Sequence, residues 1–284
     1  MEKPYLYKPV QFFSIANLIT WAAWLTAAYL SYQQNSESSR LFSILILAGL
    51  FPPFATALGM IFTSNSKELK RNFYDRLFNL KLIKLSSLPA IFLIMPLAVI
   101  VSVFLSWLFF GQSWDQLAFA KAAPSAAGLI PIPVMFFGAA LVEELGWKGY
   151  GMDSLRGQRT FFDATLIYAA LWTLWHIPLF FINHYYHNTL LRMNPLFALN
   201  FIISVFPTAF IINGLWYKNR GNILTAVLFH ATANFQGILQ MGQIAKCIET
   251  VVLIAIAALM VRFNKKIFFE EFPEQTGYFG PPAH

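Results

Sequence analysis

Eight apolar segments dominate the chain and limit the folds that it can adopt. Each is close to the length of about 20 residues that an α-helix needs to cross the hydrocarbon core of a bilayer. A spanning segment that faces lipid must form a helix or join a closed barrel, because no water is present to satisfy its backbone. We therefore predict an all-α, polytopic membrane helical bundle with about eight transmembrane helices. The predicted spans are 11–32, 41–63, 87–110, 128–149, 162–183, 196–217, 221–240 and 244–263.

The composition supports the membrane class and excludes others. Hydrophobic residues make up 57% of the chain and charged residues only 12%, whereas about 25% of a soluble domain is charged. The net charge of +7 would suggest nucleic-acid binding if the basic residues shared one soluble face. They lie between apolar segments instead, which is typical of membrane topology signals. We expect membrane lipids as partners, and no nucleic acid.

The basic residues also predict the orientation of the chain. With eight spans, alternate connections lie on the same side of the membrane. Of the 20 Lys and Arg residues, all but Arg40, Lys121, Arg192 and Lys246 fall on one side. Cytoplasmic connections carry an excess of Lys and Arg. We therefore predict an integral, multi-pass membrane protein with both termini in the cytoplasm.

A single integral membrane domain is predicted for residues 1–284, because the sequence contains no internal repeat or composition break. The connection 64–87 is basic, and its apolar residues recur with a helical period. Such a segment can lie flat on the inner leaflet. Residues 264–284 are predicted to form a short, loosely ordered tail.

Polar residues inside the spans are the best indicators of function. Glu143 and Glu144 lie near the end of the fourth span, His176 lies within the fifth, and His230 and Asn234 lie within the seventh. Ionisable groups at such depth face a cavity or a partner, because lipid does not solvate them. At a rise of about 1.5 Å per residue, Glu143, His230 and His176 lie about 10, 14 and 21 Å from the cytoplasmic surface. We predict that they line one cavity whose mouth opens to the cytoplasm.

Helical spacing predicts several pairs among these residues. His230 and Asn234 are four residues apart and therefore share a helix face. Glu144 and Lys148 have the same spacing with the acid first, the better order for an ion pair. Glu143 points about 100° away from Glu144, which leaves it free to react. Outside this group, Glu249 and Lys246 are three residues apart and predict an interfacial ion pair.

Three ordered motifs connect these residues with a known family. "EELGWK" begins at Glu143 and resembles the motif EExxxR, "WTLWH" ends at His176 and resembles FxxxH, and "HATAN" begins at His230 and matches HxxxN. The chain thus resembles the type II CAAX prenyl endopeptidases and their bacterial relatives, the CAAX proteases and bacteriocin-processing enzymes. This family consists of intramembrane glutamic proteases. The motifs fall within the region 138–240.

The resemblance implies a reaction and a role for each residue. Glu143 would act as the general base that activates a water molecule, and His176 would hold and polarise that water. His230 and Asn234 would donate hydrogen bonds to the carbonyl oxygen as it becomes an oxyanion. The implied substrate is a peptide or a lipidated protein at the membrane, either a prenylated CAAX-type substrate or a bacteriocin-like peptide. No cofactor is implied.

Supporting roles fall to Glu144, Lys148 and Trp172, and two of these residues depart from the motifs. Lys148 replaces the usual arginine, so it keeps the positive charge beside Glu144 but loses the bidentate fork. Trp172 replaces phenylalanine as a larger aromatic residue in the same packing role. Together Glu144 and Lys148 would fix the helix end and bind the substrate's backbone or C-terminus.

Two alternatives to a glutamic protease fit the same residues. Glu143, His176 and His230 could be three zinc ligands with an open fourth position, although their spacing is not the His-Glu-x-x-His pattern of many zinc proteases. A transporter or non-catalytic scaffold could also carry acids and histidines in a polar cavity. The absence of an internal duplication weighs against the transporter.

Overall fold

The computed structural model describes residues 5–33, 36–119, 132–157 and 159–270, and no strand occurs within these ranges. Short 3₁₀ and π-helical turns link the α-helices. The α-helices are α1 (Pro9–Leu30), α2 (Ser36–Ala48), α3 (Pro52–Phe62), α4 (Lys67–Leu77), α5 (Leu88–Phe110), α6 (Ile132–Gly146), α7 (Met152–Arg156), α8 (Phe161–His176), α9 (Tyr186–Met193), α10 (Pro195–Lys218), α11 (Ile223–Phe235) and α12 (Gln243–Phe263).

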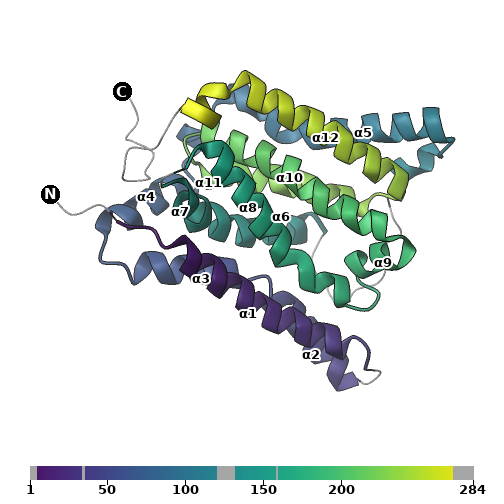
Figure 1. Cartoon of the computed structure of the whole chain (residues 1–284), viewed down its shortest axis with the longest axis horizontal. Coiled ribbons are helices and arrows are strands. Elements are labelled where there is room, and N and C mark those ends of the chain that lie inside the picture. The colour runs from purple at the N-terminus through teal and green to yellow at the C-terminus, as the bar shows by residue number, and fades with distance from the viewer. Residues whose placement is uncertain (1–4, 34–35, 120–131, 158, 271–284) are drawn as a thin grey trace.

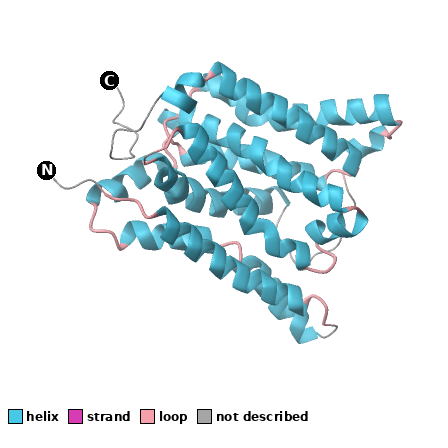
Figure 2. Cartoon of the chain, viewed as in Figure 1, coloured by secondary structure: helices cyan, strands magenta, loops and turns pink. Residues whose placement is uncertain are grey.

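The helices form a bundle in which the two flanks enclose a central group (Figure 1). Helix α1 packs against α2 and α3 on one flank, and α5 packs against α12 on the other. Between them, α6 packs against α3 and α11, while α10 packs against α8 and α12. Helices α4 and α7 lie at one end of the bundle and α9 at the other. Figure 2 shows that helix makes up nearly all of the described chain.

The prediction of an all-α membrane bundle is confirmed, but the helices differ in length. Within the described residues, five helices are long and apolar enough to cross a membrane, and the bent pair Ser39–Ala48 and Pro52–Phe62 gives a sixth. The fourth and seventh predicted spans correspond to α6 and α11, of 15 and 13 residues. A helix of 13 residues is only about 20 Å long. The predicted start of the fourth span, 128–131, lies outside the described residues, as does most of the predicted tail, 271–284.

Side-chain caps set where two central helices begin. Thr160 accepts a hydrogen bond from the backbone N–H of Asp163 at 3.0 Å and donates to the Asp163 carboxylate at 2.7 Å. Asn222 accepts from the backbone N–H of Thr225 at 2.8 Å. Such caps satisfy backbone donors that a helix start leaves unpaired. They fix the register of α8 and α11, and therefore the depth of the residues that these helices carry.

Close contacts bring α6 and α4 into the core. A Cβ atom added to Gly146 would lie 2.5 Å from the carbonyl carbon of Pro53, so only glycine allows α6 to approach α3 this closely. Leu69 and Phe73 of α4 are buried, and Arg76 donates to the buried carboxylate of Asp153. The region 64–87 is thus anchored to the bundle on one face. Its contact with a lipid leaflet stays a prediction.

Candidate active site

The last turn of α6 carries two adjacent carboxylates and continues into a π-helical turn, Trp147–Gly151. Such turns are rare and frequently occur at functional sites. Glu144 and Lys148 are both fully buried, and the Lys148 Nζ atom lies 3.3 Å from Glu144 Oε2. The ion pair predicted from their spacing is therefore present. Lys148 Nζ also lies 4.1 Å from the centre of the Tyr168 ring, a distance suited to a cation–π contact.

A histidine from α11 completes the surroundings of Glu144. Its Oε1 atom lies 2.8 Å from His230 Nδ1, so the carboxylate stands between an ammonium group and an imidazole. A carboxylate only accepts hydrogen bonds, which places a proton on His230 Nδ1. The Nε2 atom of His230 can then donate only when the ring carries both protons. The sequence predicted the Lys148 partner but not this one.

Glu143 lies beside the indole of Trp172. Its Oε2 atom accepts a hydrogen bond of 3.4 Å from Trp172 Nε1, and the side chain is 7% exposed. Within the part of the chain that the structure describes, Glu143 forms no ion pair. The two acids therefore have different partners, as their directions on the helix predicted.

The backbone of α8 orients His176. Its Nδ1 atom lies 2.7 Å from the carbonyl oxygen of Trp172, one turn earlier in the same helix. A carbonyl oxygen only accepts, so Nδ1 carries the proton and Nε2 keeps an unshared electron pair. This tautomer allows His176 to accept a hydrogen bond from water.

Glu143, His176 and His230 gather around the indole of Trp172. Its ring centre lies 5.9 Å from that of His176 and 5.6 Å from that of His230, and its N–H donates to Glu143. The sequence predicted a packing role for this aromatic residue and missed the hydrogen bond. Phenylalanine, the residue usual in the motif, has no N–H to donate.

Asn234 lies one turn beyond His230 on α11, on the wall of a cavity of about 390 Å³. Helices α9, α10 and α12 contribute most of the other walls. Phe201 of α10 lines this cavity as well, and its ring centre lies 5.5 Å from that of His176. The cavity that Asn234 lines therefore adjoins the cluster around Trp172.

His187 of α9 is a further imidazole that the sequence analysis missed. Its ring stacks on that of His176 with centres 5.9 Å apart. The side chain is buried, and neither ring nitrogen has a hydrogen-bond partner. Burial lowers the pKa of His187 well below its usual range, so the ring is neutral near pH 7. His187 falls in a predicted connection between spans and in no motif, so no sequence signal marked it as a site residue.

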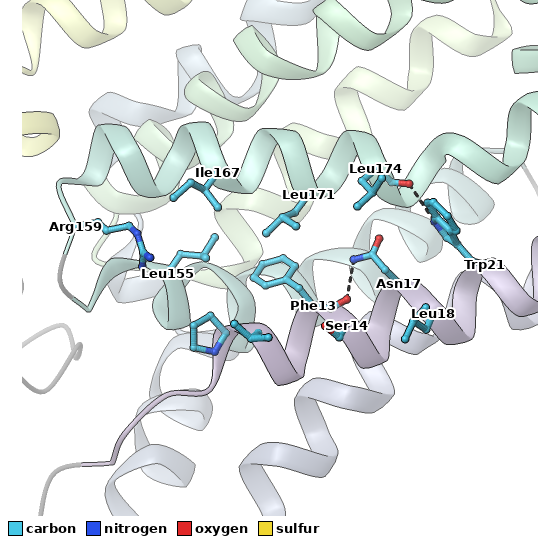
Figure 3. A pocket seen from close by; sticks show the side chains of 12 residues that line it. Phe13, Ser14, Asn17, Leu18, Trp21, Leu155, Arg159, Ile167, Leu171 and Leu174 are labelled. Carbon is cyan, nitrogen blue, oxygen red and sulfur yellow. Dashed lines mark hydrogen bonds between the residues drawn. The ribbon is translucent and has the colours of Figure 1, made fainter.

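A second cavity, of about 470 Å³, lies between α1 and α8 and holds none of the predicted site residues (Figure 3). Ile167, Leu171 and Leu174 form its α8 wall. Its polar contacts include a hydrogen bond of 3.1 Å from Trp21 Nε1 on α1 to the carbonyl oxygen of Leu174 on α8. Trp172 and His176 do not line this apolar groove, so we do not place the chemistry there.

A metal centre requires several ligands close together. Among the described residues, no three side chains of His, Cys, Asp or Glu are close enough to hold a metal ion. The alternative ligand set of Glu143, His176 and His230 is therefore not gathered at coordination distances, and the Nδ1 atoms of both histidines have other partners.

Comparison with known proteins identifies the family of the chain. Residues 125–236 match the family described as type II CAAX prenyl endopeptidase, Rce1-like. This range contains every residue of the three motifs. The chain is also similar to CAAX prenyl protease 2 of Methanococcus maripaludis, with 38% identity over 272 residues. That similarity covers 95% of this chain and 99% of the relative.

The buried ion pair predicts a specific effect on stability. Lys148→Met removes the cation and leaves Glu144 with His230 alone, so we expect a loss of about 3–5 kcal/mol. Thermal unfolding of the purified protein in detergent measures this loss. Lys148→Arg keeps the charge and is the control, expected to retain most of the stability. An unfolding temperature for Lys148→Met equal to that of the wild type would contradict a structural role for the pair.

Proposed function

The chain belongs to the Rce1-like type II CAAX prenyl endopeptidase family, and we propose that it hydrolyses a peptide bond through a water activated by Glu143 and His176. The observation that carries this proposal is the convergence of Glu143, His176 and His230 on Trp172. These side chains come from three helices that are distant in sequence. Their distinct hydrogen-bond partners suit distinct roles in one reaction.

Water activation requires a proton acceptor and a second group that orients the water. In our proposal the Glu143 carboxylate removes a proton from the water, while His176 Nε2 accepts a hydrogen bond from its other proton. The oxygen attacks the carbonyl carbon of the scissile bond and forms a tetrahedral intermediate. Glu143 then gives its proton to the leaving nitrogen as the C–N bond breaks. General acid–base catalysis of this kind typically contributes about 100- to 10,000-fold.

The developing oxyanion requires donors. We assign this role to His230 Nε2 and to the side-chain amide of Asn234. Because His230 Nδ1 is bound to Glu144, its Nε2 donates in the doubly protonated ring, and Glu144 balances that charge. Lys148 holds the other oxygen of Glu144. A single oxyanion donor is typically worth about 100- to 1,000-fold in rate.

The substrate that we propose is a peptide or lipidated protein already at the membrane. The relative from Methanococcus maripaludis is named a CAAX prenyl protease, which favours a prenylated C-terminal segment over a bacteriocin-like peptide. The predicted orientation, with both termini in the cytoplasm, would place the site within reach of cytoplasmic proteins anchored in the inner leaflet.

Glu143→Gln tests the proposed base directly. Glutamine preserves the shape of the side chain but cannot take a proton, so we expect cleavage to fall about 100- to 10,000-fold. The assay combines purified protein with a prenylated CAAX peptide and detects the products by mass spectrometry. An unfolding temperature close to that of the wild type serves as the folding control. Cleavage by the variant at the wild-type rate would refute the proposed base, and no cleavage by the wild type would favour a transporter or scaffold.

We further propose that catalysis needs no resident metal ion, since the described residues do not gather a ligand set. Activity is therefore expected to survive incubation with 1,10-phenanthroline, measured with the same peptide. A zinc protease inhibited by the same treatment is the positive control. Loss of activity that added zinc restores would support the zinc alternative.

Trp172→Phe separates the hydrogen bond of Trp172 from its packing. The variant retains an aromatic ring beside His176 and His230 but loses the donor to Glu143, so we expect about a tenfold fall in kcat with little change in KM. Trp175→Phe is the matched control, because the N–H of Trp175 donates to Thr20 at 2.9 Å, away from Glu143. We expect that variant to lose stability but to keep its kcat. Equal kcat values for Trp172→Phe and the wild type would show that the donor is not needed.

A further inference from the structure

The cavity lined by Asn234 contains charged groups that the proposed reaction does not use. Lys246 and Glu249, both on α12, belong to its wall. The sequence predicted that they form an ion pair, and this is wrong: no ion pair joins these two described residues. Each instead has surroundings that suit binding of a ligand. We refer to this space of about 390 Å³ as the α12 cavity.

Lys246 is held by an aromatic residue. Its Nζ atom lies 3.1 Å from the hydroxyl oxygen of Tyr186 and 4.4 Å from the centre of the Tyr186 ring. Tyr186 is in the first turn of α9, so this ammonium group lies at the α9 end of the bundle. An ammonium group has three N–H donors, and the Tyr186 hydroxyl accepts one. The remaining donors suit an anionic acceptor in the cavity.

Glu249 is buried without a full set of partners. Its side chain is 4% exposed, and its Oε1 atom has no hydrogen bond. A buried polar atom without a hydrogen bond carries a free-energy cost. A ligand that brings a hydrogen-bond donor into the cavity would remove this cost. The α12 cavity therefore offers a cation for an anionic group and, one helical turn away, an acceptor for a donor.

We propose that the α12 cavity binds the C-terminal end of the substrate, with the terminal carboxylate on Lys246 and a backbone N–H on Glu249. The C-terminal end of a peptide carries both groups close together. Three residues of helix rise about 4.5 Å, and an extended peptide advances about 3.3–3.6 Å per residue, so the two contacts fit adjacent groups of one chain. This proposal rests on the proposed function, because it places the scissile bond at the wall formed by Asn234.

The direction of the substrate follows from the positions of these residues. Asn234 is near the end of α11, one turn beyond His230, and Lys246 is in the first turn of α12 beside α9. A peptide bound from the catalytic cluster toward α9 would place its C-terminus on Lys246. The segment that is released would then occupy the α12 cavity, and its length would be set by the distance between Lys246 and the activated water.

The test compares two substrates that differ only at the C-terminus: a prenylated CAAX peptide with a free carboxylate, and the same peptide as a carboxamide. We expect wild-type kcat/KM to be about tenfold or more higher for the carboxylate, mainly through KM, since hydrogen-bonded charge pairs contribute substantially to binding. Lys246→Gln should lower kcat/KM for the carboxylate about tenfold and for the carboxamide much less, so that the preference for the carboxylate is lost. Lys218→Gln, at the opposite end of α10 from α9, is the control and should keep the wild-type preference.

The outcomes separate the two proposals. If the wild type cleaves both peptides equally, or if Lys246→Gln keeps the preference, Lys246 does not bind the terminus while the protease function stands. If the wild type cleaves neither peptide, the proposed function fails and this inference fails with it. If the Lys246→Gln variant still cleaves the carboxamide peptide, that activity also shows that the variant is folded.

Glu249 is tested separately in the same assay. Glu249→Leu removes the acceptor for the backbone N–H, which both peptides contain. We expect KM to rise about tenfold for both, while the preference for the carboxylate is retained. Unchanged KM values for both peptides would overturn the assignment of Glu249 and leave that of Lys246 intact.

Discussion

The buried carboxylate of Glu144 is the constraint on which the site depends. An ionised group inside an apolar bundle is unfavourable unless opposite charge and hydrogen bonds surround it. Lys148 and His230 supply these from either side. Because Lys148 lies in the π-helical turn and His230 in α11, this one carboxylate fixes the end of α6 against a helix 86 residues further along the chain. The same contact orients the His230 ring, so structural stability and the proposed oxyanion donor share one interaction.

Trp172 also positions the side chains of the site, through its backbone carbonyl, its indole N–H and its ring. Its backbone carbonyl fixes the tautomer of His176, its indole N–H binds Glu143, and its ring packs against His230. The first of these contacts explains the spacing of the second motif. A side chain four residues later in a helix lies above the carbonyl of the earlier turn, so the motif places an imidazole where the backbone can hold it.

The sequence predicted those features that depend on local spacing or on composition. The all-α bundle follows from apolar segments, and the Glu144–Lys148 pair follows from one helical turn. Contacts between distant helices, such as Glu144 with His230 and Trp172 with Glu143, have no local signal. The prediction of a Lys246–Glu249 ion pair was wrong for the same reason. The ammonium group of Lys246 contacts Tyr186, which comes from the distant helix α9. Hydropathy also measures composition and not length, so it did not reveal that α11 has only 13 residues.

The groups proposed for chemistry and those proposed for substrate binding lie on different helices. Glu143, His176 and His230 come from α6, α8 and α11, whereas Lys246 and Glu249 come from α12. A water activated at a fixed point can cut any peptide bond placed beside it, so the catalytic cluster alone does not select a position in the substrate. An anchor for the terminal carboxylate does, because the number of residues between two fixed points is limited by the length of an extended chain. Helix α12, whose packing against α5 and α10 sets the position of that anchor, would therefore determine where the substrate is cut.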